Sequence, residues 1–62
     1  MTADELIKHA RKCFEMKQLT IFLHSFHPTP ELAKAIDLWQ KAGERAEYRA
    51  DCIYCGKGDP AT

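Results

Sequence analysis

The spacing of apolar residues along the chain predicts two long amphipathic helices. In each half of the sequence, apolar side chains recur three or four residues apart, which is the repeat of one face of an α-helix. The stripe of the first half comprises Ala3, Ile7, Ala10, Phe14 and Ile21, with Leu6 and Cys13 on its flank. The stripe of the second half comprises Leu32, Ala35, Ile36, Trp39, Ala42, Gly43, Ala46, Ala50 and Ile53. We therefore expect an all-α chain with helices over roughly residues 3–26 and 30–54.

The segment His27-Pro28-Thr29-Pro30 separates the two predicted helices. A proline inside a helix removes a backbone donor and clashes with the preceding turn, and it pushes the residue before it out of helical geometry. The first helix should therefore end near Phe26. Thr29 can cap the second helix with its hydroxyl, and Pro30 suits the first helical position. Because this link is so short, we expect the helices to form an antiparallel hairpin.

The position of the bend also predicts which residues face each other across the hairpin. With a bend centred between residues 28 and 29, Phe14 lies opposite the region of Gly43, and Ile7 lies opposite Ala50. Large side chains of the first helix then meet small residues of the second. The two helices can therefore approach closely and interdigitate.

The apolar residues between positions 19 and 26 do not keep to one face of the predicted helix. A single hairpin partner cannot cover all of them, so we expect a further contact surface. The interface residues that we expect are Leu19, Phe22, Leu23, Phe26 and Trp39. The four residues between positions 19 and 26 form either the core of a dimer or a docking patch for another protein, and for Trp39 we expect a core role. A β-strand over residues 19–26 is a third interpretation, although no second strand is predicted that could pair with it.

The length of the chain favours assembly. With 62 residues it forms one domain, which we divide into a helical hairpin over residues 1–55 and a flexible C-terminal tail over residues 56–62. Chains below about 70 residues usually need a metal, disulfides or a partner subunit for stability. We therefore expect a homodimer in which two hairpins form a four-helix bundle. By architecture alone, such a dimer is similar to small plasmid- or phage-encoded regulators.

The charge and the opening residues of the chain bear on its partners and location. Nine basic and nine acidic residues give no net charge at pH 7, which disfavours nucleic acid as the main partner, although a dimer could concentrate positive charge. No run is long enough to span a membrane. The opening segment Met1-Thr2-Ala3-Asp4-Glu5 is acidic and unlike a signal peptide. We expect a cytoplasmic protein whose partner is another protein rather than a membrane.

Cys52-Ile53-Tyr54-Cys55-Gly56 is the one motif that could carry chemistry. Two cysteines separated by two residues can bind zinc, but a strong zinc signature needs a second pair of ligands. His9 and Cys13 are the nearest candidates, because they lie one turn apart on the first helix. The tail would have to fold back roughly 10 Å to unite Cys52 and Cys55 with them. A four-thiolate site shared by two subunits and ordinary free thiols are the alternatives, and free thiols are favoured.

Catalysis has little support in the sequence. Reactive cysteine pairs usually lie at a helix N-terminus, whereas this pair lies at a predicted C-terminus, where the helix dipole disfavours a thiolate. Ser25 lies near His24 and His27, but proximity at a helix end does not make a catalytic triad. We therefore expect a non-enzymatic accessory or regulatory protein that acts through protein–protein interaction and has no cofactor. The alternative is a zinc-stapled module that contacts nucleic acid through the Cys52/Cys55 site.

Overall fold

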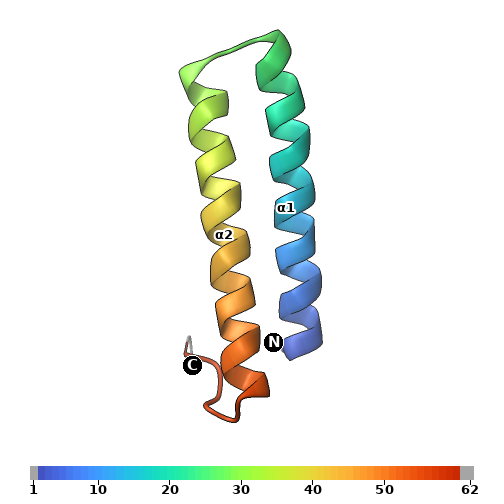
Figure 1. Cartoon of the computed structure of the whole chain (residues 1–62), viewed down its shortest axis with the longest axis vertical. Coiled ribbons are helices and arrows are strands. Elements are labelled where there is room, and N and C mark those ends of the chain that lie inside the picture. The colour runs from blue at the N-terminus through green and yellow to red at the C-terminus, as the bar shows by residue number, and fades with distance from the viewer. Residues whose placement is uncertain (1, 61–62) are drawn as a thin grey trace.

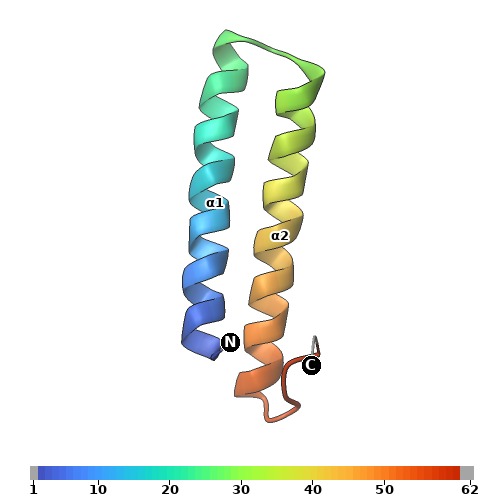
Figure 2. The same cartoon turned by 180° about the vertical axis from the view of Figure 1, so that it is seen from behind.

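The computed structural model describes residues 2–60, which form an antiparallel helical hairpin (Figures 1 and 2). Helix α1 spans Ala3–Phe26 and helix α2 spans Pro30–Tyr54, so the predicted helices and hairpin are confirmed. Residues 2–60 contain no strand, and the strand interpretation of residues 19–26 is therefore wrong. Residue 1 of the predicted hairpin and residues 61–62 of the predicted tail lie outside the described part.

Threonines cap both helices as their sequence positions predict. Thr2 and Thr29 both have extended backbone conformations, and each hydroxyl accepts a hydrogen bond from the amide three residues later at 3.2 Å. Pro30 occupies the first turn of α2, where its missing amide costs nothing. At the end of α1 the amide of His27 still donates to the carbonyl of Leu23, and then Pro28 ends the pattern. The helix bounds therefore follow from local chemistry.

A regular row of residues forms the seam between the two helices, with spacings that alternate between three and four. On α1 these seam positions are Ala3, Leu6, Ala10, Cys13, Lys17, Thr20 and His24. On α2 they are Leu32, Ile36, Trp39, Gly43, Ala46, Ala50 and Ile53. All of them are buried or half-buried. This is the seven-residue repeat that keeps a seam between two coiled helices in register along their length.

The seam on α1 is centred one residue away from the predicted stripe. Leu6 and Cys13 were expected on the flank, but they are the largest fully buried side chains. Ile7 and Phe14 were expected at the centre, and they are only half-buried. The physical reason is the closeness of the helices, which leaves room for compact side chains in the seam and moves wide ones to its edge.

The register of the hairpin agrees with the predicted bend centre between residues 28 and 29. A Cβ atom on Gly43 would lie 2.7 Å from the Phe14 ring, so the absence of a side chain there lets the ring pack. Lys17 donates a hydrogen bond to the side chain of Gln40 at 2.7 Å. These two residues are equally far along the sequence from the bend centre. Phe14 of α1 therefore does meet the small Gly43 of α2, as predicted.

The described part of the predicted tail turns back along α2. Gly56 takes a φ of 81°, a left-handed conformation that glycine adopts readily, and the amide of Lys57 donates to the carbonyl of Cys52 at 2.9 Å. Farther along, Asp59 accepts two hydrogen bonds from the Arg49 guanidinium at 2.8 and 2.6 Å, and this interaction raises the pKa of Arg49. The flexibility of the tail stays a prediction.

Charged side chains are frequent on the outward surface. The ion pair between Lys41 and Asp37, at 2.9 Å, is well exposed to water, so its contribution to stability is small. The hydrogen bond from Lys41 to Asp37 nevertheless raises the pKa of the ammonium group. Within residues 2–60, neither helix has a stretch that is both long and apolar enough to cross a membrane.

Candidate functional site

Four large apolar side chains near the bend lie in solvent. Leu19, Phe22, Leu23 and Phe26 are each between 52% and 63% exposed, and we call these four residues the bend surface. All four belong to the end of α1 that lies beside the bend (Figure 1). The hairpin itself therefore leaves this predicted contact surface uncovered.

The polar residues at the seam positions of α1 near the bend explain this exposure. Thr20 is buried in the seam, and its hydroxyl donates a hydrogen bond to the carbonyl of Met16 at 2.7 Å. Lys17 is half-buried and donates to Gln40. Because polar residues occupy the seam positions in this stretch, the apolar residues between them project to the sides and to the back of α1.

Two aromatic rings of the bend surface contact each other. The ring centroids of Phe22 and Phe26 lie 4.9 Å apart with an interplanar angle of 69°, which is the favourable edge-to-face arrangement. The neighbouring hydroxyl of Ser25 donates to the carbonyl of Phe22 at 2.6 Å. The Ser25 hydroxyl is thus engaged by the backbone of its own helix.

Trp39, the remaining predicted interface residue, is half-buried and lines a groove of about 530 Å³ on α2. Leu38 lines the same groove and is 66% exposed, yet sequence reasoning missed it because it lies beside the apolar stripe of α2. A signal was available, since Ala35, Leu38 and Ala42 form a second apolar row with the same three–four spacing. This row extends the exposed apolar surface from α1 onto α2.

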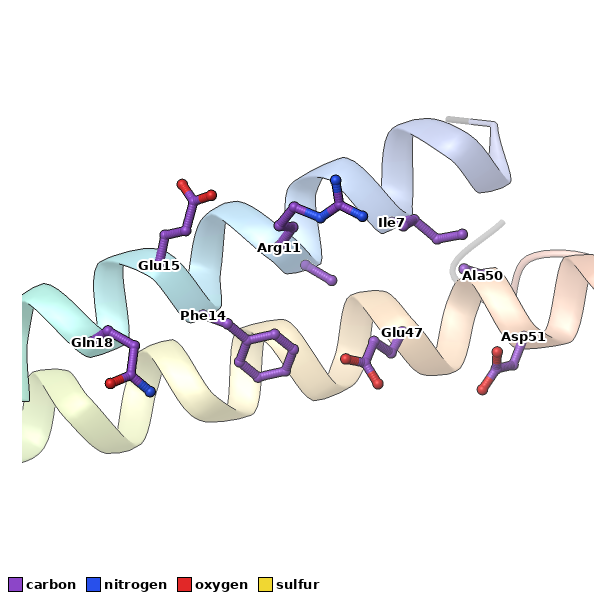
Figure 3. A pocket seen from close by; sticks show the side chains of 9 residues that line it. Ile7, Arg11, Phe14, Glu15, Gln18, Glu47, Ala50 and Asp51 are labelled. Atoms are coloured by element: carbon purple, nitrogen blue, oxygen red, sulfur yellow. The ribbon is translucent and has the colours of Figure 1, made fainter.

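A second groove, of about 540 Å³, lies between the two helices, on the broad face of the hairpin that does not carry Leu38. Figure 3 shows Ile7 and Phe14 from α1 and Glu47 and Asp51 from α2 along it. It exists because Ala50 and its neighbours in the seam are too small to fill the space between the helices. Charged groups surround this groove, so it is a poorer site for an apolar partner than the bend surface.

The predicted zinc ligands come together only in part. The Nε2 atom of His9 lies 3.7 Å from the Sγ atom of the buried Cys13. Cys52 is buried and Cys55 is exposed, and both line a small cleft of about 140 Å³ at the end of α2. Within residues 2–60, no three His, Cys, Asp or Glu side chains are grouped so that they could hold a metal. Zinc binding by these four residues stays a prediction that requires the C-terminal turn to move.

Two exposed tyrosines, Tyr48 and Tyr54, lie near Cys52 and Cys55 in the C-terminal part of α2. The Tyr54 hydroxyl donates to the Asp4 carboxylate at 3.0 Å, and this hydrogen bond raises the pKa of Tyr54. A hydrogen bond with the Cys52 thiol similarly raises the pKa of Tyr48. Both phenols therefore keep their protons to a higher pH than an isolated tyrosine.

Comparison of the chain with known protein families, curated proteins and solved structures found no match. The exposed apolar residues are therefore the feature from which a function is inferred. They lie on a rigid helical support, and they are far more numerous than the core of the hairpin requires.

Proposed function

We propose that this protein is a small non-enzymatic accessory or regulatory protein that acts as a homodimeric helical hairpin and binds another protein. The observation that carries the proposal is the exposure of the bend surface. A monomer of 7.1 kDa is expected to expose about 4,100 Å², whereas this chain exposes 4646 Å². Eight large apolar or aromatic side chains are exposed within residues 2–60, and four of them form the bend surface, as expected of a surface that another chain covers.

The weakness of the hairpin core supports the dimer. Leu6 and Cys13 are the largest side chains that are fully buried, and most of the remaining core consists of alanine. Such a core removes little apolar area from water, so it offsets little of the conformational entropy lost on folding. A second hairpin that covers Leu19 and Leu23 would add the missing burial in a four-helix bundle.

The aromatic part of the bend surface supports a further protein partner. Phenylalanine is enriched at the centres of protein interfaces, where a rigid ring buries much area at a small entropic cost. Phe22 projects to the back of α1, away from the seam, and it is more than 60% exposed. The free thiols of Cys13, Cys52 and Cys55 suit a reducing compartment, which supports the cytoplasmic location that we propose.

The test introduces a charge into the bend surface. We expect Leu23→Asp to convert the dimer to a monomer in sedimentation experiments, because a carboxylate would have to be desolvated in the interface. Phe26→Asp should reduce recovery of a protein partner by affinity isolation from the native cell. Tyr48→Asp is the matched control, since Tyr48 is an equally exposed aromatic residue far from the bend. An unchanged mass together with unchanged partner recovery would contradict the proposal.

The alternative function is a zinc-stapled module that contacts nucleic acid through the Cys52/Cys55 site. The contact between His9 and Cys13 supports it, since it supplies one ready pair of ligands. Metal analysis of the purified protein tests this alternative. Less than about half an equivalent of tightly bound zinc per chain, with Cys55 readily alkylated, would count against it.

A further inference from the structure

We propose that the two copies of the homodimer pack through one broad face of the hairpin with their bends at opposite ends. The bend halves then overlap, while the terminal halves extend beyond the contact in opposite directions. This arrangement rests on the homodimer proposed above and adds which face the second copy covers and how it is oriented.

The face is defined by the residues that directly precede the seam positions. Both helices are right-handed, but their chains run in opposite directions. Viewed from one end of the hairpin, one chain therefore winds clockwise and the other anticlockwise. Residues that precede the seam positions on both helices thus lie on the same broad face. The opposite face confirms this geometry, since Ile7, Phe14, Glu47 and Asp51 each follow a seam position and line one common groove (Figure 3).

An apolar patch occupies the bend half of this face, and we call it the face patch. Its members are Met16, Leu19, Leu23, Ala35, Leu38 and Ala42. Leu19 and Leu38 are equally far from the bend centre, so they lie at the same level along the hairpin, at the middle of the patch. Three of the six, Leu19, Leu23 and Leu38, are more than half exposed. The patch measures about 10 Å along the helices, because seven residues separate Met16 from Leu23.

The size of the uncovered surface fits a second copy. The chain exposes about 500 Å² more than a monomer of its mass is expected to expose. Specific interfaces at the low end of the range bury about 600 Å² on each partner. The three exposed leucines of the face patch supply an apolar centre for such an interface.

Charge excludes the alignment in which both bends lie at the same end. Lys12 and Arg45 lie on the same face, next to the patch on its terminal side, and both are exposed. They are equally far from the bend centre. In the parallel alignment Lys12 would face Arg45 of the second copy and Arg45 would face its Lys12. Four positive charges would then meet at one level of the interface, which opposes association.

The opposite alignment removes this repulsion and gives Arg45 an acidic partner, while Lys12 lies opposite Phe26 of the second copy. With a two-fold axis through the level of Leu19 and Leu38, Leu38 meets its own equivalent in the second copy. Arg45 lies seven residues beyond Leu38 in one direction, and Glu31 lies seven residues beyond it in the other. Seven residues are two helical turns, so both charged residues lie on the same line along α2. Arg45 of each copy therefore faces Glu31 of the second copy, and this ion pair occurs twice.

The test exchanges these two charges and measures the dimer dissociation constant by analytical ultracentrifugation. Arg45→Glu and Glu31→Arg should each weaken the dimer by roughly tenfold, because two attractive pairs become repulsive. The double variant E31R/R45E restores both pairs with reversed signs and should return to within about threefold of the original constant. Lys8→Glu is the control, since Lys8 lies on the outward side of α1, and it should leave the constant unchanged.

A second measurement does not depend on the strength of ion pairs. In a Cys55→Ser background, Leu38→Cys should form a disulfide-linked dimer on mild oxidation, because position 38 meets itself only when the bends lie at opposite ends. Arg45→Cys in the same background should not. Tighter or unchanged association of Arg45→Glu, or disulfide trapping at position 45, would overturn this arrangement and leave the homodimer standing. A monomer at every concentration would overturn both proposals.

Discussion

The terminal half and the bend half of helix α1 distribute their apolar residues in opposite ways. In the terminal half, compact apolar residues such as Leu6 and Cys13 lie in the seam, and charged residues face water. In the bend half, Lys17 and Thr20 occupy the seam positions of α1, and the large apolar residues of α1 project outward. Both halves have the same backbone geometry, so the difference lies in which face of the helix carries the apolar groups.

This difference separates two tasks within one short chain. The terminal half holds the two helices together, because its seam buries apolar side chains against small residues of α2. In the bend half, α1 contributes polar residues to the seam and leaves its large apolar groups exposed, which suits contact with other chains. Substitutions in the first region should therefore affect folding at every protein concentration. Substitutions in the second should affect association.

The largest expected effect comes from Leu6→Ala in the terminal half. Leu6 has no exposed surface, so its truncation should lower the free energy of unfolding by about 2–4 kcal/mol, from lost burial and the remaining cavity. Leu38→Ala in the bend half is the matched control. Its effect on thermal unfolding should vanish as the protein is diluted below the dimer dissociation constant. Equal effects of both variants in dilute solution would break the distinction between the two halves.

The next effect concerns the closeness of the helices in the terminal half. Gly43→Ala should gain up to about 1 kcal/mol of helix propensity but lose more than that, because the new methyl would lie 2.7 Å from the Phe14 ring. Combination with Phe14→Leu removes the clash, so the double variant should be more stable than Phe14→Leu alone. Chemical denaturation of the four proteins measures this coupling. Additive effects would mean that the ring moves aside without cost.

The smallest effect concerns the link between the two ends of the chain. The hydrogen bond to Asp4 raises the pKa of Tyr54 above the value of about 10 that it has in the unfolded chain. The stabilisation by this bond is therefore fully present below pH 10, and it is lost as the pH rises through the folded pKa. Thermal unfolding of wild type and Tyr54→Phe at pH 8 and pH 11 tests this. Their difference in Tm should shrink at the higher pH, whereas a difference that is the same at both pH values would contradict it.

The uncovered bend surface was predictable because its residues are too widely spread around α1 for one partner helix to cover. As this spread around the helix predicts, all four residues are exposed: Leu19, Phe22, Leu23 and Phe26. The contribution of α2 was not predictable in the same way. Leu38 lies next to an apolar stripe, and its exposure depends on how α2 is rotated about its own axis, which only the packed pair of helices decides.

The sequence by itself determined the helix bounds, the bend and the register, because these depend on local chemistry. Pro28 and Pro30 forbid helix between them, Thr29 starts the next one, and the shortness of the link aligns Phe14 with Gly43. The tertiary structure alone decided the rotation of each helix. Two neighbouring rows of α1, one through Leu6 and Cys13 and one through Ile7 and Phe14, have the same spacing and similar hydrophobicity. Close packing selected the compact row for the seam, since the wider side chains of the other row fit only at its edge.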